Sequence, residues 1–154
     1  MKTELFVKRS RFATPVEAVF GWHAQPGAFT RLTPPWERIE LLEESGGIQD
    51  GARVVLRIHA GPFSVRWVAL HQGYIENRQF QDVQIEGPFA KWEHTHLFEP
   101  DGPGACFLED RVEYALPFGW LGRLAGGAFT RRKLRLLFDY RHAVCRRGVG
   151  EKTE

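Results

Sequence analysis

The chain has 154 residues, a size that fits one folded domain with a substantial core. Hydrophobic residues make up 43% of it and charged residues 26%, as in ordinary soluble globular proteins, and the net charge of +2 is too small to indicate a nucleic-acid binder. Aromatic residues reach 13%, and such residues either suit β-strands or line a cavity.

Two features of the sequence bear on where the protein works. The only cysteines, Cys106 and Cys145, lie far apart and show neither metal-ligand spacing nor a disulfide framework, which favours a reducing environment. The N-terminal residues lack the apolar run of a signal peptide, and no stretch of about 18 apolar residues could span a membrane. We therefore expect a cytoplasmic protein.

The first part of the chain predicts a strand and two short helices. Residues 5–12 combine apolar and basic side chains, which indicates a strand with one polar face. Thr14-Pro15-Val16-Glu17 has the composition of a capping box and predicts a helix that ends at about His23. A second short helix is expected over residues 28–32, where Pro34-Pro35 stops it.

The middle of the chain predicts six strands joined by short turns. The strands are expected over residues 36–43, 52–60, 63–74, 79–85, 91–98 and 105–114. Their connections are rich in glycine and proline. Because a parallel pair needs a crossover of about a dozen residues, such close spacing indicates antiparallel hairpins.

A long helix is expected at the C-terminus. After Pro117 apolar residues recur at spacings of three and four up to about Arg146, and Gly126-Gly127 is an expected weak point. The whole order predicts an α+β fold in which a curved antiparallel sheet grips this helix, with a hollow wherever inward side chains leave space. We expect a single domain over residues 1–147 and a polar tail over residues 148–154.

Three segments resemble one known family. They are HAQPGAFTRLTPPW at residues 23–36, EGPF with WEHTHLF at residues 86–98, and DRVEYALP at residues 110–117. They are similar to a bacterial subgroup of the START/SRPBCC superfamily, which includes polyketide cyclase-like and lipid-transfer proteins. Some members of this subgroup are fused to an epimerase-like domain of so-called cell-division inhibitors. The resemblance implies the helix-grip fold and a small hydrophobic ligand, and it leaves the choice between binding and catalysis open.

The segment over residues 91–98 carries the most informative side chains. Strand alternation places four of them on one face: Trp92, His94, His96 and Phe98. A His-x-His pair on a strand can supply two ligands to zinc or iron. A third ligand could come from Asp110, His59 or Asp82. Because no complete ligand spacing is present, we expect no metal and no other cofactor.

Asp110 is the most unusual residue of the following strand. Alternation places it with Leu108, Val112 and Tyr114, so its carboxyl group would point into an apolar face. A buried carboxylate needs a partner, which His94 or His96 could supply. Such a pair could serve as general acid and base on an enolisable ligand, or it could only fix the strand register or anchor a ligand hydroxyl. The same argument applies to the carboxyl group of Asp82, which shares a strand face with Phe80 and Gln84.

The expected binding site combines these polar groups with aromatic walls. A single aromatic residue is normally part of a core, but several on one sheet indicate an apolar pocket. The expected ligand-contacting residues are Trp67, Asp82, Trp92, His94, His96, Phe98, Asp110 and Tyr114, with Trp36 and Phe63 as further wall candidates. His94, His96 and Asp110 are the candidates for catalysis.

Positive charge gathers in the C-terminal helix. Residues 118–147 hold eight basic residues and a single acidic one, Asp139. Such a stripe could contact phospholipid headgroups, or it could be a solvated face partly paired with acidic strands.

The sequence therefore favours a binding protein for a small apolar or amphipathic ligand held between sheet and helix. One alternative is a cyclase- or dehydratase-type enzyme that uses the His/Asp pair. Another is an interaction module that places its basic helix on a membrane or partner. No nucleic-acid partner is expected.

Overall fold

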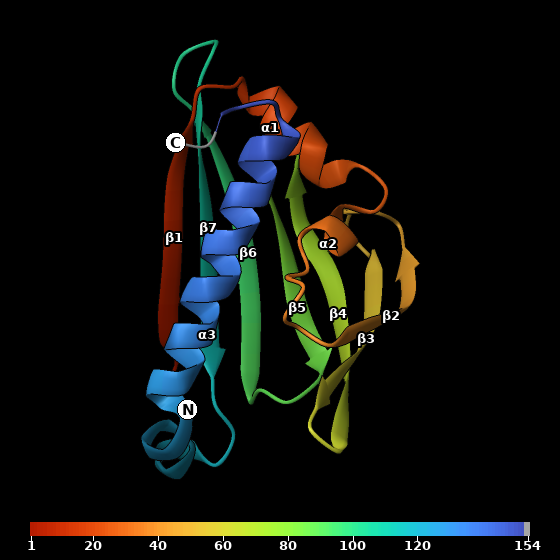
Figure 1. The fold of residues 1–154 in the computed structure, drawn as a ribbon, viewed down its shortest axis with the longest axis vertical. Coiled ribbons are helices and arrows are strands. Elements are labelled where there is room, and N and C mark those ends of the chain that lie inside the picture. The colour runs from red at the N-terminus through yellow and green to blue at the C-terminus, as the bar shows by residue number, and fades with distance from the viewer. Residues whose placement is uncertain (153–154) are drawn as a thin grey trace.

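A curved, seven-stranded antiparallel sheet and one long helix dominate the computed structural model, which describes residues 1–152 (Figure 1). The strands are β1 (Glu4–Phe12), β2 (Ile39–Ser45), β3 (Arg53–Ala60), β4 (Phe63–Ile75), β5 (Gln79–Glu86), β6 (Lys91–Pro100) and β7 (Cys106–Ala115). The helices are α1 (Val16–Ala24), α2 (Ala28–Arg31) and α3 (Gly119–Gly148). The predicted α+β helix-grip architecture is confirmed.

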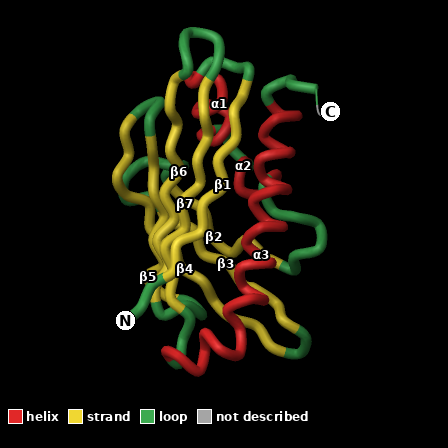
Figure 2. The backbone as a smooth tube through the Cα atoms, turned by 90° about the vertical axis from the view of Figure 1, so that its left-hand side faces the viewer, coloured by secondary structure: helices red, strands yellow, loops and turns green. Residues whose placement is uncertain are grey.

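The strand order in the sheet is β1-β7-β6-β5-β4-β3-β2, so from β2 to β7 strands that follow one another in the sequence are also neighbours in the sheet. Strands β2 to β7 are consecutive hairpins, which short turns can join, and β1 closes the other edge by pairing with β7. α3 runs along one face of this sheet, as the view from the side shows (Figure 2). It lies over β1, β7 and β6. α1 contacts β6 and β7 as well, whereas α2 lies farther across the sheet, toward β4 and β3 (Figure 1).

Two local predictions need correction. The capping box does not form: Pro15 occupies the N-cap of α1 without a side-chain cap, and the Thr14 hydroxyl instead donates to Glu151 Oε1 at 2.8 Å. The strand expected from residue 36 begins at Ile39, because Glu37 N–H donates to the Pro34 carbonyl and keeps the preceding segment in a turn.

The end of α3 is held against α1. Gly148 lies so close to the Trp22 indole that a Cβ atom there would collide with the ring. Val149 packs on the neighbouring core cluster, and Glu151 also accepts from Arg146 at 2.6 Å. α3 is continuous through Gly126 and Gly127, although its first turns bend away from the axis of the rest (Figures 1 and 2).

The core fills one half of the concave face. The predicted alternation is confirmed, since the inward side chains of β6 and β7 are all buried: Trp92, His94, His96, Phe98, Leu108, Asp110, Val112 and Tyr114. One cluster packs them against α1, and the other packs them against Leu134 and Phe138 of α3. The inward faces of β3 and β4 belong to neither cluster apart from Trp67 and Tyr74, which pack at the edges of the second and the first cluster.

Candidate functional site

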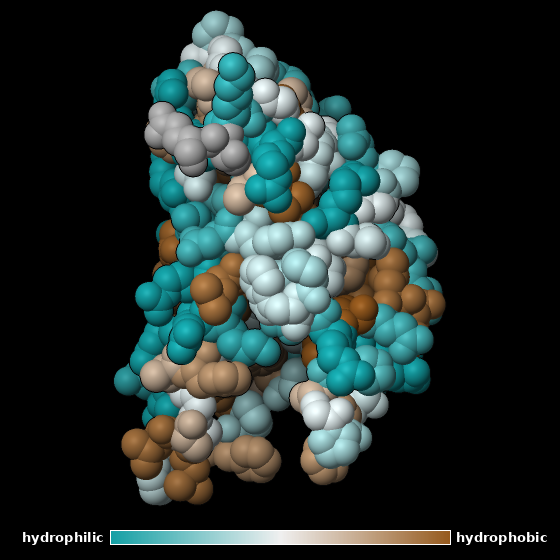
Figure 3. All heavy atoms as spheres, in the orientation of Figure 1, coloured by the Kyte–Doolittle hydropathy of each residue, from teal (hydrophilic) through white to brown (hydrophobic). Residues whose placement is uncertain are grey.

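A cavity of about 800 Å³ occupies the half of the concave face that the core leaves free. Alternate residues of β3 and β4 form its floor, among them Leu56 and Ala69, and Leu134 and Leu137 of α3 form one side. Phe29, which lies in α2, belongs to its rim. The space-filling view shows this hollow between the lower part of α3 and the β3–β4 hairpin (Figure 3). The hollow that the sequence predicted is therefore present.

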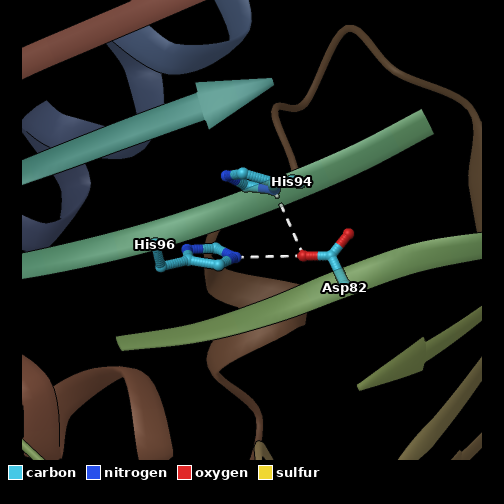
Figure 4. A group of neighbouring side chains, drawn as sticks. All are labelled: Asp82, His94 and His96. Carbon is cyan, nitrogen blue, oxygen red and sulfur yellow. Dashed lines mark hydrogen bonds and ion pairs between the residues drawn. The ribbon is translucent and has the colours of Figure 1, made fainter. Parts of the chain in front are cut away.

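A cluster of acidic and imidazole groups forms one wall of the cavity. The register pairs Asp82 of β5 with His94 of β6, and His96 with Asp110 of β7. Asp82 Oδ1 lies 3.2 Å from His94 Nδ1 and 3.0 Å from His96 Nε2. Figure 4 shows both imidazoles converging on this one oxygen. The centroids of the two rings are 3.8 Å apart, and their planes are tilted by 34°.

Asp110 lies behind the two imidazoles, away from the cavity. Its Oδ1 accepts from His94 Nε2 at 2.7 Å, and its Oδ2 bonds to His142 Nε2 at 2.6 Å. His142 Nδ1 in turn lies 2.7 Å from Ser10 Oγ. The chain of contacts therefore ties β1, β7, β6 and β5 to α3, and it holds Asp82 and His94 in place from behind.

The charges of the cluster support one another. Burial by itself would lower the pKa of His94, but the carboxylates of Asp82 and Asp110 outweigh it and raise that pKa to about 9. Burial would also raise the pKa of each aspartate, yet hydrogen bonds and charge from the imidazoles hold both well below their usual range. At neutral pH a His94 cation thus lies between two carboxylates.

Several buried nitrogen atoms along the cavity wall have no protein partner. Among residues 1–152, four buried side-chain nitrogens lack a hydrogen bond, and three of them belong to cavity-lining residues: His71 Nδ1, Trp92 Nε1 and His96 Nδ1. His96 Nδ1 lies 3.1 Å from Asp110 Oδ1 but outside hydrogen-bonding geometry. Buried polar atoms normally find a partner, so these three nitrogens are exceptions, and each lies beneath the surface of the cavity.

The structure separates the residues predicted to contact ligand into two groups. Trp67, Asp82, Trp92, His94 and His96 line the cavity. Phe98 and Tyr114 do not: Phe98 packs in the core against Phe20, and the Tyr114 hydroxyl donates to Glu4 at 3.1 Å. Asp110 reaches the cavity only through the imidazoles. The remaining wall candidates, Trp36 and Phe63, are exposed, and His59 lies beside Glu40 at the edge of the sheet.

Two basic residues of the site, His142 and Arg141, escaped the sequence analysis. His142 is buried on the inner face of α3, one turn after Phe138, and this helical spacing could have identified it. Arg141 lines the cavity, donates from Nε to the Leu32 carbonyl at 3.3 Å, and has its pKa lowered by burial. No sequence pattern distinguishes Arg141 from the other basic residues of α3.

The basic stripe of α3 is partly neutralised. Arg131 pairs with Glu4 at 2.9 Å, and Lys133 pairs with Glu37 at 3.5 Å. The start of α3 and the residue before it instead expose a group of large apolar side chains: Phe118, Trp120, Leu121 and Leu124. Within residues 1–152, no helix has both the length and the apolar character that crossing a membrane requires.

The comparisons with known proteins place this geometry in a family. No curated protein sequence matches the chain. Norcoclaurine synthase from Thalictrum flavum, solved with dopamine and hydroxybenzaldehyde, superposes with a TM-score of 0.72 at 15% identity, over 99% of this chain and 90% of that one. The Zhui aromatase/cyclase from Streptomyces sp. R1128 gives 0.64 at 15% identity, over 96% and 92%.

A third structure extends the likeness to a longer protein. The nucleoside-diphosphate sugar epimerase from Corynebacterium glutamicum matches with a TM-score of 0.71 at 26% identity. The match covers 91% of this chain but only 28% of the epimerase. The family model for polyketide cyclase/dehydrase and lipid transport matches residues 13–139. The chain therefore belongs to the polyketide cyclase/dehydrase and lipid transport family, within the START/SRPBCC superfamily.

Proposed function

We propose that the protein binds a small amphipathic ligand in the cavity between the sheet and α3. The observation that carries this proposal is an apolar cavity of about 800 Å³ with a polar cluster on one wall. Sites for small molecules have volumes of about 300–1,000 Å³ and are mostly apolar with a few fixed polar groups. The cavity has this size and this composition.

The two kinds of wall define the chemistry of the ligand. Leu56, Ala69 and Leu137 would cover its apolar part, and each buried methylene contributes about 0.8 kcal/mol. Asp82 would accept a hydrogen bond from a hydroxyl group, since its side chain retains 20% of its exposure. A purely aliphatic ligand would cover this carboxylate without giving it a hydrogen bond.

Native mass spectrometry of protein purified from its host tests the proposal first, because a bound ligand adds a discrete mass that disappears on denaturation. An environment-sensitive fluorescent probe then measures affinity in delipidated protein. Ala69→Phe fills part of the cavity from β4 and should weaken probe binding at least tenfold. Ser64→Phe, on the exposed face of the same strand, is the matched control and should bind as the wild type does. Equal binding by both variants would contradict the proposal.

Acid–base chemistry on the bound ligand is a second candidate function. It is favoured by the position of Asp82, which reaches the cavity while two imidazoles bond to one of its oxygens. A carboxylate held in this way can take a proton from carbon beside a carbonyl group, and the neighbouring imidazoles can return it. The co-purified ligand, once identified, should exchange that hydrogen for deuterium in heavy water. Asp82→Asn should abolish the exchange while affinity falls by no more than about tenfold. Exchange at the wild-type rate in Asp82→Asn would eliminate this function.

A further inference from the structure

We propose that Asp82, His94 and His96 form a binding site for a divalent first-row transition-metal ion in the wall of the cavity. One carboxylate oxygen and one nitrogen from each imidazole lie within 4.8 Å of one another (Figure 4). Two histidines and one carboxylate are a ligand set for iron, zinc and related ions. The sequence left Asp110, His59 and Asp82 open as the third ligand, and the β5–β6 register places Asp82 beside the His-x-His pair.

The distances between the donors fit a shared ion. Asp82 Oδ1 is 3.2 Å from His94 Nδ1 and 3.0 Å from His96 Nε2. For an ion about 2.1 Å from each donor, the two donor–ion–donor angles would be about 90–100°. Such angles suit adjacent positions of an octahedral ion better than a tetrahedral one. The three protein ligands would leave the remaining coordination positions of the ion to water or to a ligand in the cavity.

The surroundings of the three donors resemble the support of a metal site. Histidine ligands generally donate their other ring N–H to a carboxylate, which fixes the tautomer and the ring orientation. His94 Nε2 does this toward Asp110 Oδ1 at 2.7 Å, which leaves Nδ1 directed at Asp82. Asp110 is itself fixed by His142, and His142 by Ser10. The nitrogen that would bind the ion is therefore oriented by a contact chain that reaches α3 and β1.

The charge of the cluster is also suited to a cation. Two carboxylates, Asp82 and Asp110, flank the imidazoles within 2.7–3.2 Å. The ion would take the position between His94 Nδ1 and Asp82 Oδ1, which lie 3.2 Å apart. The metal site needs no ligand in the cavity, so a failure of the proposed ligand binding would not refute it.

Cobalt binding to the whole chain tests the site. After dialysis against a chelator, the wild type should bind one Co²⁺ per chain, followed by visible absorption and calorimetry. Asp82→Asn and His96→Gln each remove one donor and should weaken binding at least 100-fold. Asp110→Asn removes the carboxylate behind His94 and should weaken it by about 10–100-fold. His71→Gln removes an imidazole of the same cavity that belongs to no donor set, and it should bind as the wild type does.

Two results would overturn the assignment. One is a folded wild type that binds neither Co²⁺ nor Zn²⁺ at submillimolar concentration. The other is binding that survives Asp82→Asn and His96→Gln, or that His71→Gln removes. If a variant fails to fold, NMR of the wild type decides the question, because Co²⁺ should broaden the imidazole signals of His94 and His96 before any others. Broadening centred elsewhere also refutes the site.

Discussion

Replacing Asp110 by Asn should destabilise the metal-free protein strongly. The substitution keeps the shape of the side chain but removes the negative charge that His94 and His142 contact at 2.7 and 2.6 Å. Breaking a buried charge pair from one side costs about 3–5 kcal/mol, because the other charge stays buried without its partner. Domains have total stabilities of about 5–15 kcal/mol, so this loss is a large fraction of the whole.

Urea denaturation in the presence of a chelator measures the effect. The midpoint should fall at an unchanged slope, and the melting temperature should drop by roughly 10 °C. Glu109→Gln is the matched control: it makes the same change one residue away, on the outer face of β7, where Glu109 pairs with Arg9 at 3.0 Å. A surface pair of this kind contributes about 0–1 kcal/mol. If the two variants lost equal stability, the charge network around Asp110 would not be a major source of stability.

Three further predictions concern regions outside the cluster. Gly148→Ala should destabilise the fold by about 1–3 kcal/mol in the same denaturation assay, because its Cβ would collide with Trp22, whereas Gly104→Ala, in open space, should not. The wild type should bind anionic vesicles through the apolar start of α3, and Trp120→Ser, which removes a side chain that is 65% exposed, should reduce cosedimentation; equal cosedimentation of both proteins would exclude this surface. Burial raises the pKa of the Cys106 thiol to about 11, so a thiol reagent should modify it slowly at neutral pH and rapidly in denaturant, and fast labelling of the folded protein would contradict this burial.

Periodicity made most of the fold predictable from the sequence. The side-chain period of a strand is a local property, so alternation correctly placed His94 and Asp110 on the buried face. Short turns likewise fixed the antiparallel order of the hairpins. The capping box failed because Thr14 lies one residue before the N-cap, where its hydroxyl reaches the distant Glu151 instead of the first turn of α1.

The candidate site was less predictable because it depends on contacts between distant segments. Which residue of β5 faces His94 depends on the register, and the turn that sets this register leaves no periodic signal in the sequence. The role of His142 depends on how α3 docks on the sheet. The position of the cavity depends on the same docking, because α3 covers the β6–β7 half and leaves the inward faces of β3 and β4 lining free space.

The division of the concave face into a filled half and a hollow half has an evolutionary consequence. Packing is concentrated beneath β6 and β7, whereas β3 and β4 form the floor of the chamber and contribute little to the two core clusters. Substitutions that change the shape of the chamber therefore disturb few of the contacts that keep the protein folded. Such a scaffold can acquire new specificities through small steps, and it offers engineers a set of positions where recognition can be redesigned without rebuilding the rest of the molecule.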